Sequence, residues 1–317
     1  MKVLVTPTSL QPGKNEAMLS ILREQGYDLV FNPAGRPLEA DELKELLADC
    51  DGYVAGLDFI TREVLENCPN LKVVSRYGVG CDRVDLEAAK ELGIAVTNTP
   101  GVNAEAVGEL AFGLILAVAR KIPYLDRSTR EGGWVRSTGM EMLGKTIGIL
   151  GLGAIGKVVA RCAGGFGMKV MAYDPYINED YCKEHDIESA SFEEVMQRAN
   201  VISLHLPLLP STTHMIDGKA FEMMQPGTIL VNASRGGIID EDAAYEALKS
   251  GKLGGLALDA FEQEPPKDSK LFEFDNVIAT PHTGAHTREA TDNMARASIQ
   301  NLIDILDGKA SRFIVNK

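Results

Sequence analysis

The stretch Thr146-Ile-Gly-Ile-Leu-Gly-Leu-Gly-Ala-Ile-Gly156 decides the fold of this 317-residue chain. Its first five residues are apolar or β-branched, which predicts a buried strand, and residues 157–163 have the composition of a helix. The turn between them follows the pattern G-x-G-x-x-G. Gly151 permits a tight turn there, Gly153 lets a pyrophosphate approach the backbone, and Gly156 lets the helix pack close to the sheet. The stretch therefore predicts an α/β unit that holds a dinucleotide at a helix N-terminus.

A bare G-x-G-x-x-G also arises from an ordinary tight turn in a chain that contains 31 glycines. The next strand supports the dinucleotide interpretation, because it is predicted over residues 169–173 and is followed by Asp174, 18 residues after Gly156. A carboxylate at that spacing accepts hydrogen bonds from a ribose diol and repels a 2'-phosphate, which favours NAD over NADP. The alternative is that Asp174 only caps the turn before Pro175.

The rest of the chain alternates short β-rich runs with helical runs, which is typical of a parallel sheet with crossover helices. A complete doubly wound sheet is predicted after residue 145, with strands over residues 146–150, 169–173, 201–205, 228–232, 255–259 and 277–280. A shorter α/β series precedes it, with strands over residues 3–6, 53–57, 72–75 and 94–97 and helices over residues 16–25, 62–66 and 85–92.

The length of the chain allows two hydrophobic cores. After Thr287 one amphipathic helix is predicted, and it would return to pack on the first α/β series. We therefore expect a smaller substrate (catalytic) domain of residues 1–100 and 286–317. The NAD-binding Rossmann domain is expected over residues 101–285. The apolar segment 103–120 is expected to be a buried helix between the two domains.

Composition excludes several classes of function. Thirty-two Lys and Arg against 45 Asp and Glu give a net charge of −13, which repels nucleic acid and anionic membrane surfaces. The five cysteines have no CxxC spacing, so no disulfide framework and no metal site is expected. No signal peptide and no apolar run of about 20 residues is visible, which favours a cytoplasmic location. A small anionic substrate remains compatible, because one arginine in a cleft overrides the global field at short range.

Three ionisable residues follow successive strands on the side where an open α/β sheet binds ligands: Arg235, Glu264 and His282. The arginine fork could hold a carboxylate and an adjacent keto oxygen. Histidine is the residue type most often used as a proton donor near neutral pH, and a carboxylate beside it would stabilise its protonated form. Taken singly, the three could instead be a surface ion-pair partner, a solvated loop acid and a helix cap. Together they form an acid, its tuning group and an anion clamp.

At this point the sequence resembles the D-isomer-specific 2-hydroxyacid dehydrogenases, most closely the branch that contains D-3-phosphoglycerate dehydrogenase and the glyoxylate or hydroxypyruvate reductases. The resemblance covers nearly the whole chain. It rests on the motifs Tyr77-Gly-Val-Gly-Cys-Asp-Arg-Val-Asp85, Gly148-Ile-Leu-Gly-Leu-Gly-Ala-Ile-Gly156, His205-Leu-Pro-Leu-Leu-Pro-Ser-Thr-Thr213, Asn232-Ala-Ser-Arg-Gly-Gly-Ile-Ile-Asp240, Leu258-Asp-Ala-Phe-Glu-Gln-Glu-Pro-Pro266 and Pro281-His-Thr-Gly-Ala285.

The resemblance implies two Rossmann-like doubly wound domains, with the nucleotide-binding domain inserted into a smaller flavodoxin-like substrate domain. It implies an oxidoreductase that interconverts a small 2-keto acid and a D-2-hydroxy acid with NAD, with Arg235, Glu264 and His282 as the catalytic three. It also implies a homodimer built largely from the nucleotide domains, with the segment 103–120 involved.

The site residues that the resemblance implies fall into two groups. The substrate carboxylate is received by Gly78, Val79 and Gly80, together with Arg235. The cofactor is contacted by Gly151, Gly153, Ala154, Ile155, Gly156, Asp174, His205, Pro207, Thr212, Ala233, Arg235, Asp259, His282 and Gly284, of which Asp259 and the backbone of Ala233 lie near the nicotinamide.

Several rival functions stay open. Phosphoglycerate dehydrogenases grip the substrate phosphate with an arginine after the third strand of the small domain, where this chain has Ala55, and Asp58 would add a repulsive charge. A true D-3-phosphoglycerate dehydrogenase remains the alternative. A non-catalytic NAD(H)-sensing protein that resembles the corepressors of this fold is a second one. Formate dehydrogenase is disfavoured because that branch lacks the glutamate beside its histidine, and phosphite oxidation is a further alternative.

Overall fold

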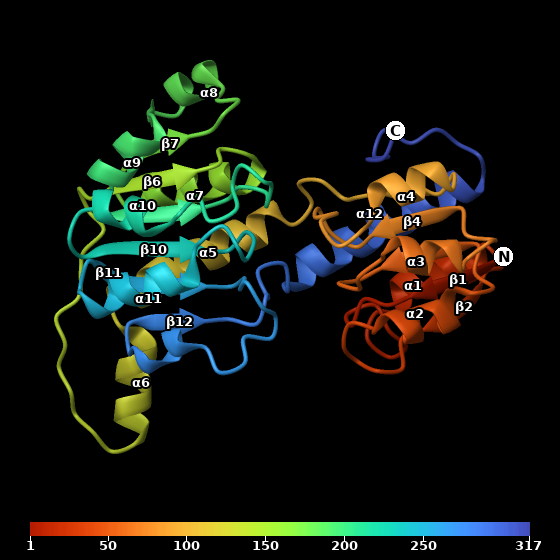
Figure 1. Ribbon diagram of the computed structural model, residues 1–317, viewed down its shortest axis with the longest axis horizontal. Coiled ribbons are helices and arrows are strands. Elements are labelled where there is room, and N and C mark those ends of the chain that lie inside the picture. The colour runs from red at the N-terminus through yellow and green to blue at the C-terminus, as the bar shows by residue number, and fades with distance from the viewer. The chain divides into compact units, whose positions relative to one another are not determined.

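The computed structural model describes all of residues 1–317. The chain forms two compact units. The smaller unit consists of residues 1–103 and 287–317, and the larger unit consists of residues 104–286 (Figure 1). Each unit contains one parallel sheet with helices on both faces, so the expected α/β fold class is confirmed.

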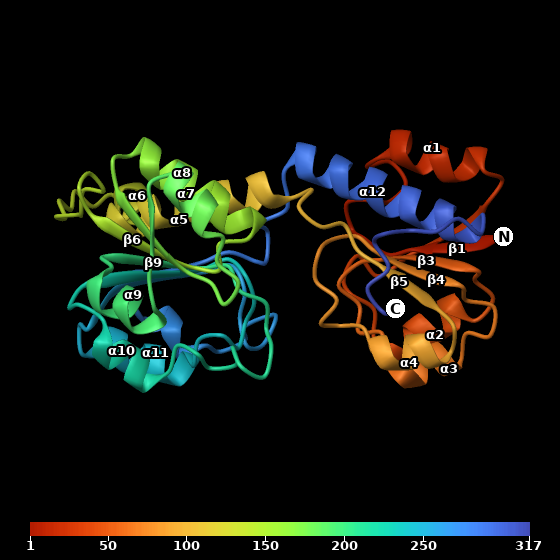
Figure 2. The ribbon, with the colours of Figure 1, turned by 90° about the horizontal axis from the view of Figure 1, so that it is seen from above.

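The smaller unit contains a five-stranded parallel sheet in the order β2-β1-β3-β4-β5. Alternate side chains of β1 enter different cores, as the two-residue period of a strand requires: Val3 and Val5 pack with helices α1 and α12, whereas Leu4 packs on the opposite face. Figure 2 shows α1 and α12 on one face of this sheet and α2, α3 and α4 on the other. The strands are β1 (Lys2–Val5), β2 (Asp28–Phe31), β3 (Gly52–Ala55), β4 (Val73–Arg76) and β5 (Ala95–Thr97), and the helices are α1 (Glu16–Glu24), α2 (Ala40–Leu47), α3 (Arg62–Glu66), α4 (Leu86–Glu91) and α12 (Arg288–Leu306).

The C-terminal helix α12 packs on the smaller unit as expected, because it contacts β3, β4 and α1. Its first turn is capped by Thr287, whose Oγ1 accepts a hydrogen bond of 3.1 Å from the N–H of Ala290. Strand β2 and helix α2 were not predicted from the sequence. Strand β2 has four residues that are all half-buried or exposed, so it gives no alternating pattern, and the amphipathic pattern of α2 extends over only eight residues.

The larger unit contains a seven-stranded parallel sheet in the order β12-β11-β10-β9-β6-β7-β8. The six expected strands are present, and the seventh is the edge strand β8, whose three residues pair with β7 and are too short to give a pattern. The strands are β6 (Thr146–Leu150), β7 (Lys169–Tyr173), β8 (Ile187–Ser189), β9 (Val201–Leu204), β10 (Thr228–Asn232), β11 (Leu253–Leu258) and β12 (Val277–Ala279). From β6 the chain adds β7 and β8 on one side of the sheet, and then β9 to β12 on the other side. Because the direction of strand addition changes between β6 and β9, a crevice is expected beyond the carboxyl ends of these two strands.

The helices of the larger unit cover both faces of the sheet, with α5, α6, α7 and α8 on one face and α9, α10 and α11 on the other (Figure 2). Helix α5 is mostly buried, as expected, and packs against α7 and against β10 and β11. The helices are α5 (Ala104–Ala119), α6 (Ile122–Arg130), α7 (Ala154–Gly165), α8 (Glu179–Glu184), α9 (Phe192–Arg198), α10 (Gly218–Met223), α11 (Glu241–Lys249) and the 3-10 helix η1 (Lys270–Glu273). No helix has the length and apolar character needed to cross a membrane.

Candidate active site

The glycine-rich turn after β6 has the geometry that close backbone packing requires. Gly151 has φ +96°, and a Cβ there would lie 2.6 Å from the carbonyl oxygen of His205. A Cβ on Gly156 would lie 2.1 Å from the carbonyl oxygen of Gly151, which no side chain could tolerate. Gly153 differs, because a Cβ there would meet nothing within 4 Å. The turn is therefore held tightly at both ends and faces open space at its centre.

That open space lies at the N-terminus of α7, where a dinucleotide pyrophosphate would fit. Gly153 is the N-cap residue and offers no side-chain cap to the first N–H groups of the helix. Those groups, with the positive end of the helix dipole, are suited to bind phosphate oxygens. Ala154 and Ile155, the first residues of α7, supply the backbone of this turn. The residues present thus fit the phosphates of the predicted cofactor.

Asp174 follows β7 and braces the glycine-rich turn. Its Oδ2 accepts a hydrogen bond of 2.8 Å from the N–H of Leu152, and its Oδ1 accepts one of 2.8 Å from the N–H of Tyr176. The second bond is the local turn that the alternative interpretation anticipated. Each carboxylate oxygen has a further lone pair, so both bonds leave Asp174 able to accept from a ribose diol.

His205, which follows β9, is a neutral imidazole inside the unit. Its Nε2 lies 2.9 Å from Ser203 Oγ, and its buried Nδ1 has no partner in the protein. Burial lowers the pKa of His205 to about 3. An unpaired ring nitrogen beside the glycine-rich turn is a group that a bound ligand could satisfy.

Thr212 fixes the loop that follows His205. Its hydroxyl donates a hydrogen bond of 2.7 Å to the carbonyl oxygen of Pro207 and accepts one of 2.8 Å from the N–H of Leu209. The hydroxyl is thus engaged within the loop. Thr212 would therefore act on a cofactor indirectly, because its hydroxyl holds the exposed loop at Pro207 and does not itself contact the ligand.

Arg235 lies on a compact turn after β10. The side chain of Asn232 donates a hydrogen bond of 2.7 Å to the carbonyl oxygen of Arg235 and accepts from the N–H and hydroxyl of Ser234 at 3.0 and 2.7 Å. A Cβ on Gly236 would lie 1.8 Å from the carbonyl oxygen of Phe261. The Arg235 turn therefore packs, backbone on backbone, against the segment that leads to Glu264. Ala233, at the start of the turn, is buried.

Glu264 and His282 form a direct pair. His282 Nδ1 lies 2.8 Å from Glu264 Oε1, and the same oxygen accepts a hydrogen bond of 3.3 Å from the N–H of Phe261. The side chains are 30% and 18% exposed, so the pair is partly shielded from water but reachable by a ligand. Because a carboxylate only accepts, Nδ1 carries the hydrogen and Nε2 is the ring nitrogen left to face a ligand.

Asp259 holds the loop that carries His282. Its Oδ1 accepts from the Thr280 hydroxyl at 2.6 Å and the Thr283 N–H at 2.8 Å, and its Oδ2 accepts from the Gly284 N–H at 2.8 Å. His282 itself has φ +51°, a left-handed conformation that is uncommon for a side chain of this size. The buried Asp259 thus fixes both ends of a strained turn. The sequence did not predict this role of Asp259, nor the bracing by Asn232 and Thr280.

The remaining predicted site residues, Gly78 to Gly80, lie in the smaller unit directly after β4. The expectation that Asp58 repels a substrate phosphate is wrong. Asp58 is only 1% exposed and accepts hydrogen bonds from Thr6, Tyr53 and the N–H of Leu38. Its carboxylate is engaged inside the unit by donors from three separate segments of the chain, a fact of tertiary packing that the local sequence does not show.

The comparison with known proteins decides the family. Residues 112–284 match the family model described as "D-isomer specific 2-hydroxyacid dehydrogenase, NAD binding domain". The chain belongs to the D-isomer specific 2-hydroxyacid dehydrogenase family. The matched residues fall within the larger unit, which is therefore an NAD-binding domain, and the expected cofactor NAD is confirmed.

Relatives in the family carry different names. The chain is similar to a D-3-phosphoglycerate dehydrogenase of Methanocaldococcus jannaschii, with 42% identity over 320 residues that cover 100% of this chain and 59% of the relative. It is similar to a glyoxylate reductase of Thermococcus litoralis, with 42% identity over 87% of this chain and 86% of the relative. A solved D-lactate dehydrogenase of Aquifex aeolicus in complex with NAD and lactic acid is 29% identical over 96% of each chain, with a TM-score of 0.83. The chain thus spans about three fifths of the phosphoglycerate dehydrogenase that it matches.

The half-buried His205 of this family member predicts a loss of stability in acid. An unfolded chain protonates the imidazole below its ordinary pKa of 6.5, whereas the folded protein does not until about pH 3. The unfolded state therefore binds the extra proton in that window, and stability falls as the pH falls through it. We expect the free energy of unfolding to drop, between about pH 7.5 and about pH 5, by on the order of 1 to 2 kcal/mol more in the native protein than in His205→Asn.

Urea denaturation at both pH values measures this difference. His286→Asn is the matched control, since His286 is an exposed imidazole of the same unit, and it should keep the native pH slope. An unaltered slope in His205→Asn would assign the acid sensitivity to other groups.

Proposed function

We propose that this member of the family interconverts a small 2-keto acid and the corresponding D-2-hydroxy acid. The observation that carries the proposal is the contact of 2.8 Å between His282 Nδ1 and Glu264 Oε1, on a domain that binds NAD. NAD supplies the hydride acceptor or donor for carbon 2 of the substrate. What the protein must add is a proton at the keto oxygen and a grip on the carboxylate.

His282 is the proposed proton donor. In the direction of reduction, Nε2–H of the imidazolium gives its proton to the oxygen on carbon 2 as that carbon accepts the hydride, and the imidazole is left neutral. Glu264 stabilises the imidazolium through Nδ1 and keeps the ring in one orientation. Oxidation of the hydroxy acid runs the same steps in reverse, with His282 as the base.

Arg235 is the proposed substrate clamp. Its guanidinium Nη1 donates to the carbonyl oxygen of Ser234 at 2.8 Å, which orients the fork. A planar fork matches the paired oxygens of a 2-keto acid. We propose that Gly78 to Gly80 of the smaller unit form a binding site for the substrate carboxylate.

The smaller unit favours an unphosphorylated substrate. Ala55, the last residue of β3, and Asp58 in the loop after it are buried, and the exposed side chains of this loop are Leu57 and Phe59. Arg83 stacks over Phe59 at 4.7 Å and donates to the carbonyl oxygen of Leu57, so this cation is engaged with the loop itself. Apolar side chains in this loop suit a small acid better than a phosphate ester.

The substrate panel tests the proposed activity. NADH oxidation is measured with glyoxylate, hydroxypyruvate, pyruvate, a branched 2-keto acid and 3-phosphohydroxypyruvate, and NADPH is run in parallel. We expect NADH to be preferred and one unphosphorylated acid to have the highest kcat/KM. The highest value for the phosphorylated acid would instead identify a D-3-phosphoglycerate dehydrogenase. NADH binding without turnover of any of the five would support a non-catalytic NAD(H)-sensing protein.

Loss of His282 should remove the proton transfer and spare cofactor binding. In His282→Gln we expect the rate of reduction to fall by about 100-fold or more while the Kd of NADH, from fluorescence, is kept. His214→Gln is the matched control, because His214 Nε2 also lies 3.0 Å from a glutamate, Glu262, at an exposed position. Near-native turnover in His282→Gln would exclude it as the proton donor.

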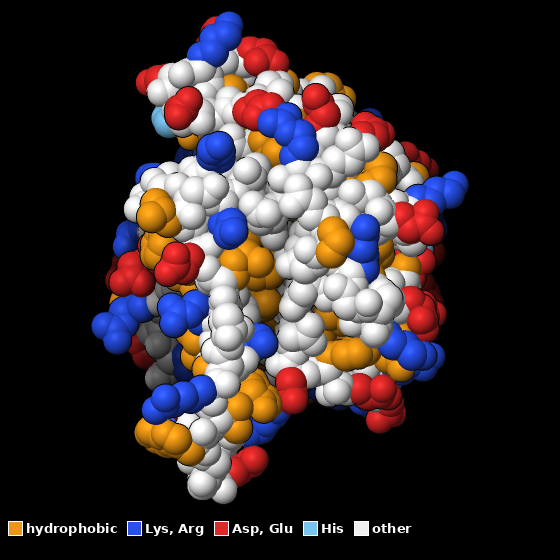
Figure 3. All heavy atoms as spheres, turned by 90° about the vertical axis from the view of Figure 1, so that its left-hand side faces the viewer, with side chains coloured by type: hydrophobic (Ala, Val, Ile, Leu, Met, Phe, Trp, Pro, Cys, Tyr) orange, Lys and Arg blue, Asp and Glu red, His pale blue; other side chains and the backbone are white.

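We also propose a homodimer formed by the larger unit. Helix α6 has no buried residue, and the segment after it exposes Trp134 (81%) and Leu143 (75%). Figure 3 shows hydrophobic side chains among the charged ones on the face of the larger unit along which this segment runs. Exposed apolar side chains of this size are typical of an interface.

Sedimentation velocity tests the dimer. We expect a species of twice the 34.2 kDa chain mass, and we expect Trp134→Ser to raise the dissociation constant. A native protein that sediments as a monomer at micromolar concentration contradicts the proposal. Equal dissociation constants for the native protein and the variant would place the interface elsewhere.

A further inference from the structure

We propose that Asn98 is a positioning residue for the substrate carboxylate, because its side chain turns the Gly78 to Gly80 loop so that the loop offers backbone N–H groups to an anion. The inference rests on the proposed function, and it names the residue that prepares the carboxylate site. Asn98 follows β5 and lies in the same unit as the loop.

All three carbonyl groups of the loop are held by donors of the smaller unit. The N–H of Thr99 donates to Gly78 O at 3.0 Å, Asn98 Nδ2 donates to Val79 O at 2.9 Å, and Arg76 Nε donates to Gly80 O at 3.0 Å. Two consecutive residues, Asn98 and Thr99, thus fix two consecutive peptide groups. The loop itself supplies none of these donors.

Carbonyls that are held in this way fix the direction of the N–H groups. In a trans peptide the N–H points away from the C=O of the preceding residue, and the only cis bond of the chain is elsewhere. The N–H groups of Val79 and Gly80 therefore point away from Asn98 and Thr99. Neither donates a hydrogen bond within the protein. Successive N–H groups with one orientation form an anion-binding nest.

The glycines allow this arrangement. Gly78 has φ +147°, which L side chains rarely adopt, and a Cβ there would face open space. Val79, between the glycines, is 39% exposed. The loop backbone is thus open to a ligand, and its geometry depends on Arg76, Asn98 and Thr99, which donate to its carbonyl groups.

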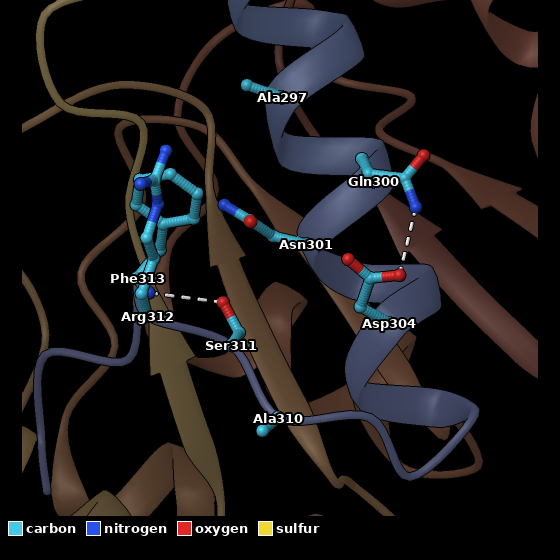
Figure 4. Close-up of a pocket in the computed structure, with 8 residues that line it drawn as sticks. All are labelled: Ala297, Gln300, Asn301, Asp304, Ala310, Ser311, Arg312 and Phe313. Atoms are coloured by element: carbon cyan, nitrogen blue, oxygen red, sulfur yellow. Dashed lines mark hydrogen bonds between the residues drawn. The ribbon is translucent and has the colours of Figure 1, made fainter.

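Asn98 is itself anchored from two sides. Its carbonyl oxygen accepts from Asn301 Nδ2 of α12 at 3.0 Å, and its N–H donates to the carbonyl oxygen of Phe313 at 3.3 Å. Figure 4 shows Asn301 and Phe313 on the lining of a hollow of about 270 Å³ between α12 and the C-terminal segment. The backbone of Asn98 is therefore fixed independently of its side chain. Removing the side chain should release the loop and leave the unit folded.

Asn98 is a better test than Arg76. Arg76 is only 4% exposed and its guanidinium also donates to the carbonyl oxygen of Gly56, so its loss would leave two carbonyls unpaired in the interior. Asn98 is half-buried and its side chain makes one bond. Asn67 offers a matched control, because its exposed amide donates to the carbonyl oxygen of Glu63 at 2.7 Å in the same unit.

The kinetic test uses the full chain and the 2-keto acid that the native protein reduces fastest. For Asn98→Ala we expect KM of the keto acid to rise about tenfold, with kcat changed by less than about twofold and the Kd of NADH unchanged. Asn98→Asp should raise KM further, since a carboxylate cannot donate to Val79 O and repels the substrate. Asn67→Ala should match the native values. An unchanged KM in Asn98→Ala overturns the inference and leaves the proposed function standing.

A binding test separates the inference from the proposed activity. Oxamate, a small 2-oxo carboxylate analogue, is titrated into ¹⁵N-labelled protein with and without NADH. We expect oxamate to move the Val79 and Gly80 amide resonances downfield in the native protein and in Asn67→Ala. In Asn98→Ala the same shift should require at least about a tenfold higher oxamate concentration. Should no keto acid be turned over, this result would still support the carboxylate site. If the Val79 and Gly80 amide resonances of the native protein do not shift when oxamate is added, the inference is overturned.

Discussion

The parallel direction of all seven strands in the larger unit determines where its chemistry can occur. Parallel strands bring their carboxyl ends to one edge of the sheet, and the loops that leave those ends are the only segments that meet there. Each candidate residue follows a strand in this way: the glycine-rich turn follows β6, and Asp174, His205, Arg235, Asp259 and His282 follow β7, β9, β10, β11 and β12. The long separations between them along the chain are therefore no obstacle to one shared site.

Backbone contacts decide how closely these loops approach one another. A Cβ on Gly151 would lie 2.6 Å from the carbonyl oxygen of His205, and a Cβ on Gly236 would lie 1.8 Å from the carbonyl oxygen of Phe261, so both glycines pack against the backbone of a neighbouring loop. The second contact is the more informative, because it sets the turn that carries Arg235 directly against the segment that carries Glu264. A shift of either loop would separate the anion clamp from the acid pair, which depends on close positioning. The geometry of the pair is thus a property of glycine packing as much as of the charged side chains.

Strong local patterns explain which parts could be predicted from the sequence. The β6–α7 unit combines an apolar strand, a spaced glycine motif and a helix, and all three agree with the structure. Strand β8 has three residues, and β2 has no fully buried position, so neither leaves a signal. Gly236 and Gly237 look alike in sequence, yet one is needed for a close contact and the other for φ +79°. Asp58 was misjudged for a related reason, since its three donors come from segments far apart in the chain.

Local donors also reconcile a net charge of −13 with an anionic cofactor and the proposed anionic substrate. Asp174 accepts from two backbone N–H groups, and Asp259 accepts from two backbone N–H groups and a hydroxyl. Each acid therefore has its potential offset by dipoles of its own unit. The groups whose charge or dipole suits an anion are the α7 N-terminus, the Arg235 guanidinium and, in the smaller unit, the N–H groups of Val79 and Gly80. Acids that serve as internal acceptors build the loops, and the donors that those loops expose determine which charge can bind.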